Sequence, residues 1–216
     1  MLAILDYGAG NRTSVLRALE YAGIPAAITA DPAEVSRCDG IVFPGVGAAG
    51  QAMRELRTRG LDEAIRKGMA AGTPILGICL GSQIVLEKSE EDDARCLGLI
   101  AGECRKFSRE ELDEEGKRIK IPHMGWNNLI VKKSSRILDN VPVNSEFYFV
   151  HSYYVEPPEN TVIATARHGR EFCALYGEDG AWFAQFHIEK SGRPGLTMLE
   201  NFYKYCAEKK NCCPDA

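Results

Sequence analysis

The first hundred residues repeat a pattern in which a short apolar run is followed by a longer segment whose apolar positions have helical spacing. After the apolar run at 2–7, Leu19 follows Val15 and Leu16 by one helical turn. Such runs predict strands, and such spacing predicts helices. Their alternation predicts an α/β fold with a parallel sheet. The expected strands are 2–7, 24–29, 40–43 and 73–78, and the expected helices are 11–21, 51–70 and 81–90.

After residue 97 the pattern changes to strand-like runs with few helical intervals. We expect these runs to add hairpins to the same sheet. A charged stretch of mixed sign at 105–120 predicts a solvated loop or an exposed hairpin, and residues 194–209 predict a last helix. The strand-like runs are 97–107, 126–133, 147–155, 161–166 and 181–188.

Composition and charge exclude several classes of protein. The chain has 216 residues, of which 45% are hydrophobic and 26% charged, as in globular proteins, and we expect one domain over residues 1–216. The formal net charge of −4 argues against nucleic acid or an anionic membrane as the main partner. The longest apolar stretches, at 40–49 and 73–82, are much shorter than the ~18 residues of a membrane-spanning helix.

The cysteines and the N-terminus indicate the compartment. The eight cysteines contain no CxxC pair, and their spacing suggests neither a disulfide framework nor a zinc site. The first residues lack a basic region and carry Asp6, so no signal peptide is expected. The sequence therefore predicts a reduced, cytoplasmic protein without a metal or cofactor, in which most cysteines are small buried hydrophobes.

A glycine-rich segment at 45–50 satisfies GxGxxG directly after a predicted strand. A dinucleotide site would require an acid about 20 residues later at the end of the next strand, but that strand ends in Gly77, Ile78 and Cys79. The segment is therefore interpreted as a loop that stabilises an oxyanion, with a plain tight turn as the alternative.

The sharpest chemical signal is Cys79, which lies between Gly77 and Gly81 in the pattern of a nucleophile elbow. The glycines allow a sharp strand-to-helix turn that exposes the thiol. The start of the following helix favours the thiolate, and the N–H of Leu80 is placed to bind a developing oxyanion. The alternative is a structural cysteine at an ordinary turn.

A thiolate nucleophile requires a base, and the chain has four histidines. Only His187 has an acid two residues away; in an extended segment Glu189 lies on the same face and fixes the imidazole. His168 lies in a turn-like segment, and His123 and His151 are more typical of a polar core or an interface. The predicted triad is Cys79, His187 and Glu189.

In these segments, and in others given below, the sequence resembles the class I (triad) glutamine amidotransferases and, among them, the glutaminase subunits of imidazole glycerol phosphate synthases. The resemblance implies a three-layer α/β fold, in which a mostly parallel central sheet has helices on both faces and added β-hairpins in the second half. It covers nearly the whole chain. The matching blocks, in order, are residues 6–11, 44–47, 77–83, 122–127, 149–153 and 186–192.

The resemblance implies that Cys79 attacks the side-chain amide of glutamine and that a thioester is then hydrolysed to glutamate, with release of ammonia. It also implies an oxyanion site formed by the N–H groups of Leu80 and Val46, the latter after a peptide flip that Gly45 and Gly47 permit. Further residues implied to hold glutamine are Gln83 and Glu91. For Glu91 a solvated position in an acidic run is the alternative.

The resemblance further implies a partner, a (βα)8-barrel cyclase subunit that forms a heterodimer with this chain and consumes the ammonia. The residues implied to face that partner are Asn11, His123, Trp126, Asn127, Tyr148 and Lys190. For Trp126 a core position is the alternative. Other functions left open are the glutaminase subunit of another synthase, a stand-alone thiol hydrolase and a non-catalytic scaffold.

Two features depart from the resemblance. The family usually has proline between the catalytic histidine and glutamate, whereas this chain has Ile188. On an extended segment position 188 faces away from the triad, so catalysis is expected to survive. The tail at 209–216, which contains Cys212, Cys213 and Pro214, matches no element of the family.

Overall fold

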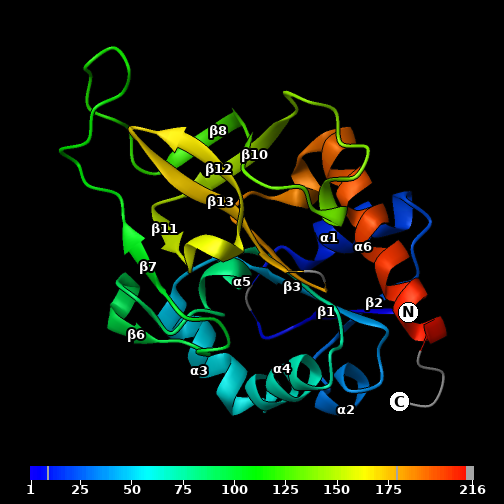
Figure 1. The fold of residues 1–216 in the computed structure, drawn as a ribbon. Coiled ribbons are helices and arrows are strands. Elements are labelled where there is room, and N and C mark those ends of the chain that lie inside the picture. The colour runs from blue at the N-terminus through cyan, green and yellow to red at the C-terminus, as the bar shows by residue number, and fades with distance from the viewer. Residues whose placement is uncertain (9, 179, 213–216) are drawn as a thin grey trace.

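The computed structural model describes residues 1–8, 10–178 and 180–212, and most of its strands join one twelve-stranded sheet (Figure 1). The strand order is β2-β1-β3-β4-β14-β13-β11-β7-β5-β6, and β12 pairs with both β13 and β9. The strands of this sheet are β1 (Leu2–Leu5), β2 (Ala26–Thr29), β3 (Gly40–Gly45), β4 (Ile75–Cys79), β5 (Lys88–Ser89), β6 (Ala94–Arg95), β7 (Glu103–Lys106), β9 (Ile130–Val131), β11 (Tyr153–Glu156), β12 (Val162–His168), β13 (Arg170–Glu178) and β14 (Ala181–Ala184).

The sheet is parallel from β2 through β1, β3 and β4 to β14, which confirms the parallel core expected from the alternating pattern. The helices are α1 (Arg12–Tyr21), α2 (Pro32–Val35), α3 (Ala49–Thr58), α4 (Leu61–Ala70), α5 (Leu80–Gln83) and α6 (Gly192–Cys212), and the 3-10 turns are η1 (Glu91–Asp93), η2 (Arg136–Leu138), η3 (Glu159–Thr161) and η4 (Ile188–Lys190).

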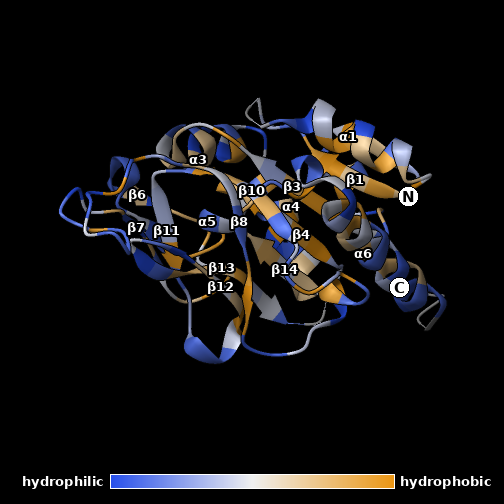
Figure 2. Cartoon of the chain, turned by 90° about the horizontal axis from the view of Figure 1, so that it is seen from above, coloured by the Kyte–Doolittle hydropathy of each residue, from blue (hydrophilic) through white to orange (hydrophobic). Residues whose placement is uncertain are grey.

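Alternating strand residues build two hydrophobic cores, one on each face of the sheet. On β3, Val42 packs in the core that includes α1 and α6 residues, and Ile41 and Phe43 pack in the core that includes residues of α2, α3 and α4. Figure 2 shows hydrophobic residues along the central strands. The sheet therefore lies between two helical layers, as the resemblance to the class I amidotransferases implies.

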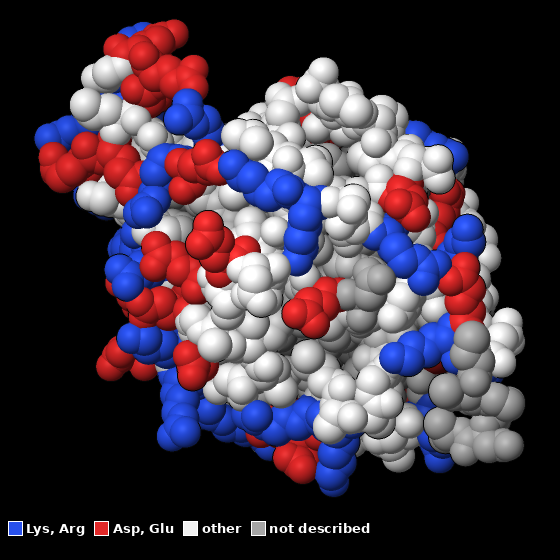
Figure 3. Space-filling model, viewed as in Figure 1, with Lys and Arg blue, Asp and Glu red and all other residues white. Residues whose placement is uncertain are grey.

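The second half is β-rich as expected, but not all of it joins the central sheet. Strands β8 (His123–Asn128) and β10 (Glu146–His151) pair only with each other, in a separate two-stranded sheet. The expectation of hairpins in a single sheet is therefore wrong for these two strands. The charged stretch is an exposed hairpin with a bridge between Leu112 and Arg118, and Figure 3 shows acidic and basic side chains mixed on it.

Two expected helices differ from the structure. The helix predicted at 51–70 is interrupted where Gly60 adopts φ 67°, which separates α3 from α4. The helix predicted at 81–90 is only the short α5, because the carbonyls of residues 84–86 accept hydrogen bonds from the N–H groups of residues 97–99 instead of from a continuing helix. Among the described residues, no helix has the length and apolar character needed to cross a bilayer. The unmatched tail, from residue 213 on, lies outside the described residues.

Candidate active site

Cys79 lies at the end of β4, where the chain turns sharply into α5. It adopts φ 53° and ψ −110°, a strained conformation for a residue with a side chain. The neighbouring glycines are sterically required: an ideal Cβ would lie 2.6 Å from Phe183 Cδ1 at Gly77 and 1.9 Å from the carbonyl oxygen of Phe43 at Gly81. The sequence prediction of a tight elbow is confirmed by this geometry.

The thiol of Cys79 opens into a cavity of about 420 Å³ between the elbow and strands β10 and β11. Six of the predicted site residues line this cavity. The structure therefore brings them together from four separate segments of the chain. They are Val46, Cys79, Leu80, Gln83, Glu91 and His187.

The predicted base and its acid are in hydrogen-bond contact. His187 Nδ1 lies 2.9 Å from Glu189 Oε1, and both side chains are at most 2% exposed. Asn11 Nδ2 donates a second hydrogen bond of 3.3 Å to the same carboxylate oxygen. Burial opposes protonation of His187, but its interactions with Cys79 and Glu189 are stronger and raise its pKa to about 10. The contact with Glu189 therefore favours the imidazolium form of His187. The Nε2 atom of that ring makes no hydrogen bond to the described residues.

Strand β10 fixes the backbone around His187. The N–H of His187 donates to the Tyr148 carbonyl at 2.8 Å, and Ser191 Oγ both donates to the His187 carbonyl at 2.6 Å and accepts from the Tyr148 N–H at 3.0 Å. A displacement of β10 therefore changes the position of the candidate base directly.

The loop after β3 approaches the elbow closely. Gly45 pairs with Cys79 in register, and a Cβ at Gly45 would lie 2.7 Å from Leu80 Cβ. Gly47 has φ 100° and open space where a Cβ would be, while Val46 is 39% exposed and borders the cavity. These features fit the interpretation of this segment as an adjustable oxyanion loop better than that of a dinucleotide site.

Gln83 and Glu91 both border the cavity but differ in their contacts. Gln83 is 4% exposed and donates hydrogen bonds through Nε2 to the Tyr153 carbonyl and to Gln185 Oε1. Glu91 is half-buried, so it is not the fully solvated residue considered as the alternative. Its Oε2 accepts from the N–H of Ala49 at 2.9 Å, at the start of α3, and burial raises its pKa although that hydrogen bond lowers it.

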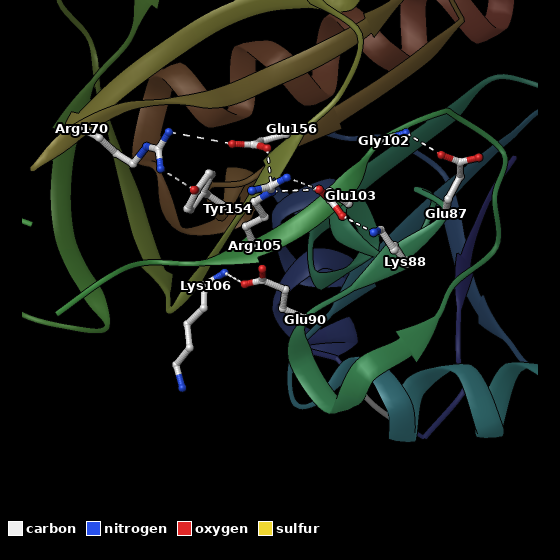
Figure 4. A network of polar contacts seen from close by, with 10 residues as sticks. All are labelled: Glu87, Lys88, Glu90, Gly102, Glu103, Arg105, Lys106, Tyr154, Glu156 and Arg170. Atoms are coloured by element: carbon white, nitrogen blue, oxygen red, sulfur yellow. Dashed lines mark hydrogen bonds and ion pairs between the residues drawn. The ribbon is translucent and has the colours of Figure 1, made fainter. Parts of the chain in front are cut away.

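A polar network anchors the segment that carries Glu91 (Figure 4). Glu90 Oε2 accepts from the Lys106 N–H at 2.7 Å, and Lys88 Nζ lies 2.6 Å from Glu103 Oε2. The network continues through Arg105 to Glu156 on β11. Exposed ion pairs contribute little stability individually, so we assign this network mainly a role in fixing the position of β5 and η1.

The residues predicted to face a partner divide into exposed and buried ones. Trp126 is 54% exposed, which argues against the core alternative, and its ring centroid lies 5.9 Å from that of Tyr148. Lys190 is exposed, with Nζ 5.8 Å from the centre of the Tyr148 ring. Asn11 is half-buried against Glu189, so its structural contact is with the triad.

His123 and Asn127 lie behind that surface in a hydrogen-bonded chain. The Tyr153 carbonyl can only accept, so His151 Nδ1, 2.7 Å away, donates to it and its Nε2 accepts. His123 Nδ1, 3.0 Å from that Nε2, is then a donor, and His123 Nε2 accepts from Asn127 Nδ2 at 3.3 Å. Both rings are neutral in this arrangement.

Burial and neighbouring histidines keep these rings neutral. Burial lowers the pKa of His151 to about 3, against the hydrogen bond to the Tyr153 carbonyl, and burial and His168 lower that of His123 to about 4. The His168 ring stacks on that of His123 with centroids 4.2 Å apart. This cluster matches the expectation of a satisfied polar core for His123 and His151.

We expect this cluster to make the protein less stable in mild acid. Between the ordinary histidine pKa of about 6.5 and the folded values of about 4 and 3, only the unfolded chain binds these protons. The free energy of unfolding should therefore decrease as the pH is lowered, by roughly 1.4 kcal/mol per pH unit for each histidine. His187 is protonated in both states below about pH 6.5 and adds no slope there.

Urea unfolding at several pH values between about 5 and 6.5 measures this slope. The variant His151→Gln should have a shallower slope than the unaltered chain, because one of the two histidines no longer titrates. Equal slopes would contradict the neutral, buried state of His151.

Two residues of the site, Gln185 and Ser191, were not singled out by the sequence, and a third, His151, was interpreted only as a core or interface residue. Gln185 is fully buried and donates to Cys79 Sγ, and Ser191 links His187 to β10. His151 borders the cavity. The one signal for Gln185 is its position two residues before His187, which places both on one side of an extended segment. Among the described residues, no group of three or more histidines, cysteines or acids is arranged to hold a metal ion.

Comparisons with known proteins identify the family of the chain. Residues 3–206 match the family described as "Glutamine amidotransferase class-I". A protein of Nitratidesulfovibrio vulgaris named "Imidazole glycerol phosphate synthase subunit HisH" is 56% identical over 208 residues, which cover 96% of this chain and 98% of that protein. A protein of the same name from Neisseria meningitidis is 40% identical over 94% of this chain and 99% of its own.

Solved structures support the fold. A putative GMP synthase subunit from Thermoplasma acidophilum has a TM-score of 0.74 at 20% identity, with 99% of this chain and 97% of that one covered. The structure of PurLQS from Thermotoga maritima has a TM-score of 0.70 at 16% identity, with 94% and 97% covered. At these identities the likeness concerns the fold alone.

Proposed function

Because the chain belongs to the class I glutamine amidotransferases, we propose that it is the glutaminase subunit of an imidazole glycerol phosphate synthase and that Cys79, His187 and Glu189 carry the reaction. The observation that carries this proposal is that His187, whose Nδ1 lies 2.9 Å from Glu189 Oε1, borders the same cavity as Cys79 of the elbow. The full-length identity to proteins of that name supports the assignment to this synthase rather than to another.

The reaction proceeds in two halves. The Cys79 thiolate adds to the side-chain carbonyl carbon of glutamine, and the C–N bond breaks as His187 Nε2 gives its proton to the leaving ammonia. A γ-glutamyl thioester remains. His187 then removes a proton from water, which attacks the thioester, and cleavage of the C–S bond releases glutamate and restores the thiolate.

The raised pKa of His187 suits the first half of this reaction. With a pKa of about 10 the ring holds its proton near neutral pH and is ready to deliver it to nitrogen. Glu189 stabilises the positive charge of the His187 ring and accepts a hydrogen bond from its Nδ1–H. The other nitrogen, Nε2, then faces the reacting atoms.

The remaining site residues are assigned to binding. The N–H groups of Leu80 and Val46, next to Gly45 and Gly47, stabilise the oxyanion of the tetrahedral intermediate. Gln83 has its amide N–H groups occupied, so its Oε1 is the atom that accepts from glutamine. Glu91 offers its carboxylate to the α-ammonium group while it holds the first turn of α3.

Ammonia is mostly protonated in neutral water and is then no nucleophile, so the product must pass to its acceptor through a shielded path. We assign this acceptor to a cyclase subunit with a (βα)8-barrel fold that forms a heterodimer with this chain. The exposed Trp126 and Lys190 flank the half-buried Tyr148, and together they form an aromatic and basic surface suited to such an interface. Because β10 holds His187, contacts on this surface reach the triad.

The experiment that tests this function measures glutamine hydrolysis by the isolated chain, with the cyclase partner, and with both that partner and its acceptor substrate. The isolated chain is expected to be nearly silent, because a loop that turns the Val46 N–H away leaves one oxyanion donor, and one missing donor costs about 10²–10³ in rate. Docking then favours the competent loop by differential contacts. Full activity in the isolated chain, unchanged by partner and acceptor, would instead indicate a stand-alone thiol hydrolase.

A second expectation concerns the departure at Ile188. Its side chain is 1% exposed and packs in the core of α1 and α6, away from the cavity, and His187 before it has the extended backbone that precedes proline. Ile188→Pro should therefore leave glutamine turnover within roughly tenfold, since proline is compatible with the start of such a turn. Steady-state glutaminase assays of the complex check this, and a complete loss of turnover would contradict it.

A further inference from the structure

Gln185 is a fully buried amide that touches the reacting sulfur. Its Nε2 lies 3.8 Å from Cys79 Sγ, and its side chain is 0% exposed. The backbone N–H of Gln185 donates to the Ala174 carbonyl at 2.9 Å, which ties the segment after β14 to β13. We propose that Gln185 is a further catalytic residue, whose side-chain N–H stabilises the thiolate of Cys79 by a hydrogen bond.

The direction of this hydrogen bond follows from a fixed point outside the site. The Tyr153 carbonyl can only accept, so the side-chain atom of Gln83 that lies 3.3 Å from it is the nitrogen. The same nitrogen lies 2.9 Å from the side chain of Gln185, which must therefore present its oxygen there. The Nε2 of Gln185 is then turned to the sulfur and not away from it.

Burial gives this contact its effect. A buried amide that leaves a donor unsatisfied costs free energy, and the sulfur is the acceptor that the described structure offers to Gln185 Nε2. A neutral thiol accepts weakly, whereas a hydrogen bond to an ionised acceptor is about twice as strong. The donor therefore stabilises the thiolate form more than the thiol form, without itself carrying a charge that would repel the imidazolium of His187.

The same side chain also orients the proposed glutamine-binding residue. Gln185 Oε1 and the Tyr153 carbonyl hold both N–H groups of Gln83, so the Gln83 oxygen has one fixed direction. Loss of the Gln185 amide should consequently affect two steps, the reactivity of Cys79 and the binding of glutamine. This inference rests on the proposed role of Cys79 as nucleophile.

The test compares the unaltered chain with Gln185→Met and Gln185→Glu, each in complex with the cyclase partner. Methionine has similar volume and no donor, and glutamate places a negative charge beside the sulfur. The rate of Cys79 alkylation by iodoacetamide is measured against pH. Its midpoint should rise by about one pH unit in Gln185→Met, which is a tenfold smaller ratio of thiolate to thiol at a given pH, and by more in Gln185→Glu. The KM for glutamine should also rise.

A matched control, Thr161→Val, removes another buried hydrogen bond, from Oγ1 to the Pro158 carbonyl, outside the cavity. Its alkylation midpoint should equal that of the unaltered chain. Circular dichroism shows which variants are folded, and a folded Gln185→Met or Gln185→Glu with an unshifted midpoint would overturn the inference alone. If alkylation of Cys79 left glutamine hydrolysis by the unaltered chain intact, the proposed nucleophile would fall first, and this inference with it.

Discussion

Replacing Cys79 with alanine is expected to abolish glutamine-dependent synthesis by the complex while ammonium salts still support it. The thiol is the nucleophile proposed at the elbow, and no other cysteine or serine is placed between Gly77 and Gly81. Alanine meets the same backbone strain at φ 53° as cysteine, so the elbow should persist. Glutamine turnover should fall to background, a loss of many orders of magnitude for a covalent mechanism.

The control for this experiment is Cys96→Ala, which removes a different buried thiol that does not border the cavity. It should keep its glutamine-dependent rate. Product formation from glutamine and from ammonium salts is measured in parallel for both variants. A Cys79→Ala complex that used glutamine at the full rate would remove Cys79 from the mechanism.

The parallel core and the elbow could be predicted from the sequence because both depend on local signals. Apolar runs of four to six residues that alternate with segments of helical spacing leave few alternatives to a parallel sheet. The glycines around Cys79 predict the elbow because a side chain would not fit there. The structure agrees, since a Cβ at Gly81 would lie 1.9 Å from the Phe43 carbonyl oxygen on the neighbouring strand β3. The spacing of His187 and Glu189 predicts their pairing on an extended segment. In the structure the strand β14 ends at Ala184, and the 3-10 turn η4 brings Glu189 to His187 Nδ1, so the premise of an extended segment is wrong although the two side chains meet.

The features that escaped prediction depend on contacts between distant parts of the chain. The separation of β8 and β10 from the main sheet has no local signature, because both read as ordinary strands. The contact of Gln185 with Cys79 joins residues 106 positions apart. Likewise, the neutral state of His123 and His151 follows from a chain of hydrogen bonds that ends at the Tyr153 carbonyl, and spacing alone does not reveal it.

The packing and hydrogen bonds around the elbow offset its backbone strain. A non-glycine residue at positive φ costs of order 1–3 kcal/mol and persists where the surrounding structure determines it. Here the determinants are the register of Gly45 with Cys79, the bond from Ser82 Oγ to the Cys79 carbonyl at 2.6 Å, and the close packing of Gly81 on β3. The strain therefore serves to hold the sulfur in the cavity that His187 also borders.

The variant Glu189→Gln is expected to lower glutamine turnover by up to about 10⁴-fold, because an amide can donate to His187 Nδ1 and impose the wrong tautomer. The carboxylate accepts from His187 Nδ1 at 2.9 Å and from Asn11 Nδ2 at 3.3 Å, so loss of its charge also withdraws support from the imidazolium. Because Glu189 is one of the causes that raise the pKa of His187 to about 10, the high-pH limb of the rate profile should move to lower pH.

Steady-state assays of the complex from about pH 6 to pH 10 measure both effects, with Glu159→Gln as a control for loss of an exposed carboxylate. The control should match the unaltered chain throughout. Asn11→Ala, which removes only the 3.3 Å hydrogen bond and leaves the carboxylate, should cost much less, within about tenfold. An unchanged rate and profile in Glu189→Gln would mean that this buried carboxylate only supports the fold, and that His187 takes its orientation from the hydrogen bonds of its backbone to Tyr148 and Ser191.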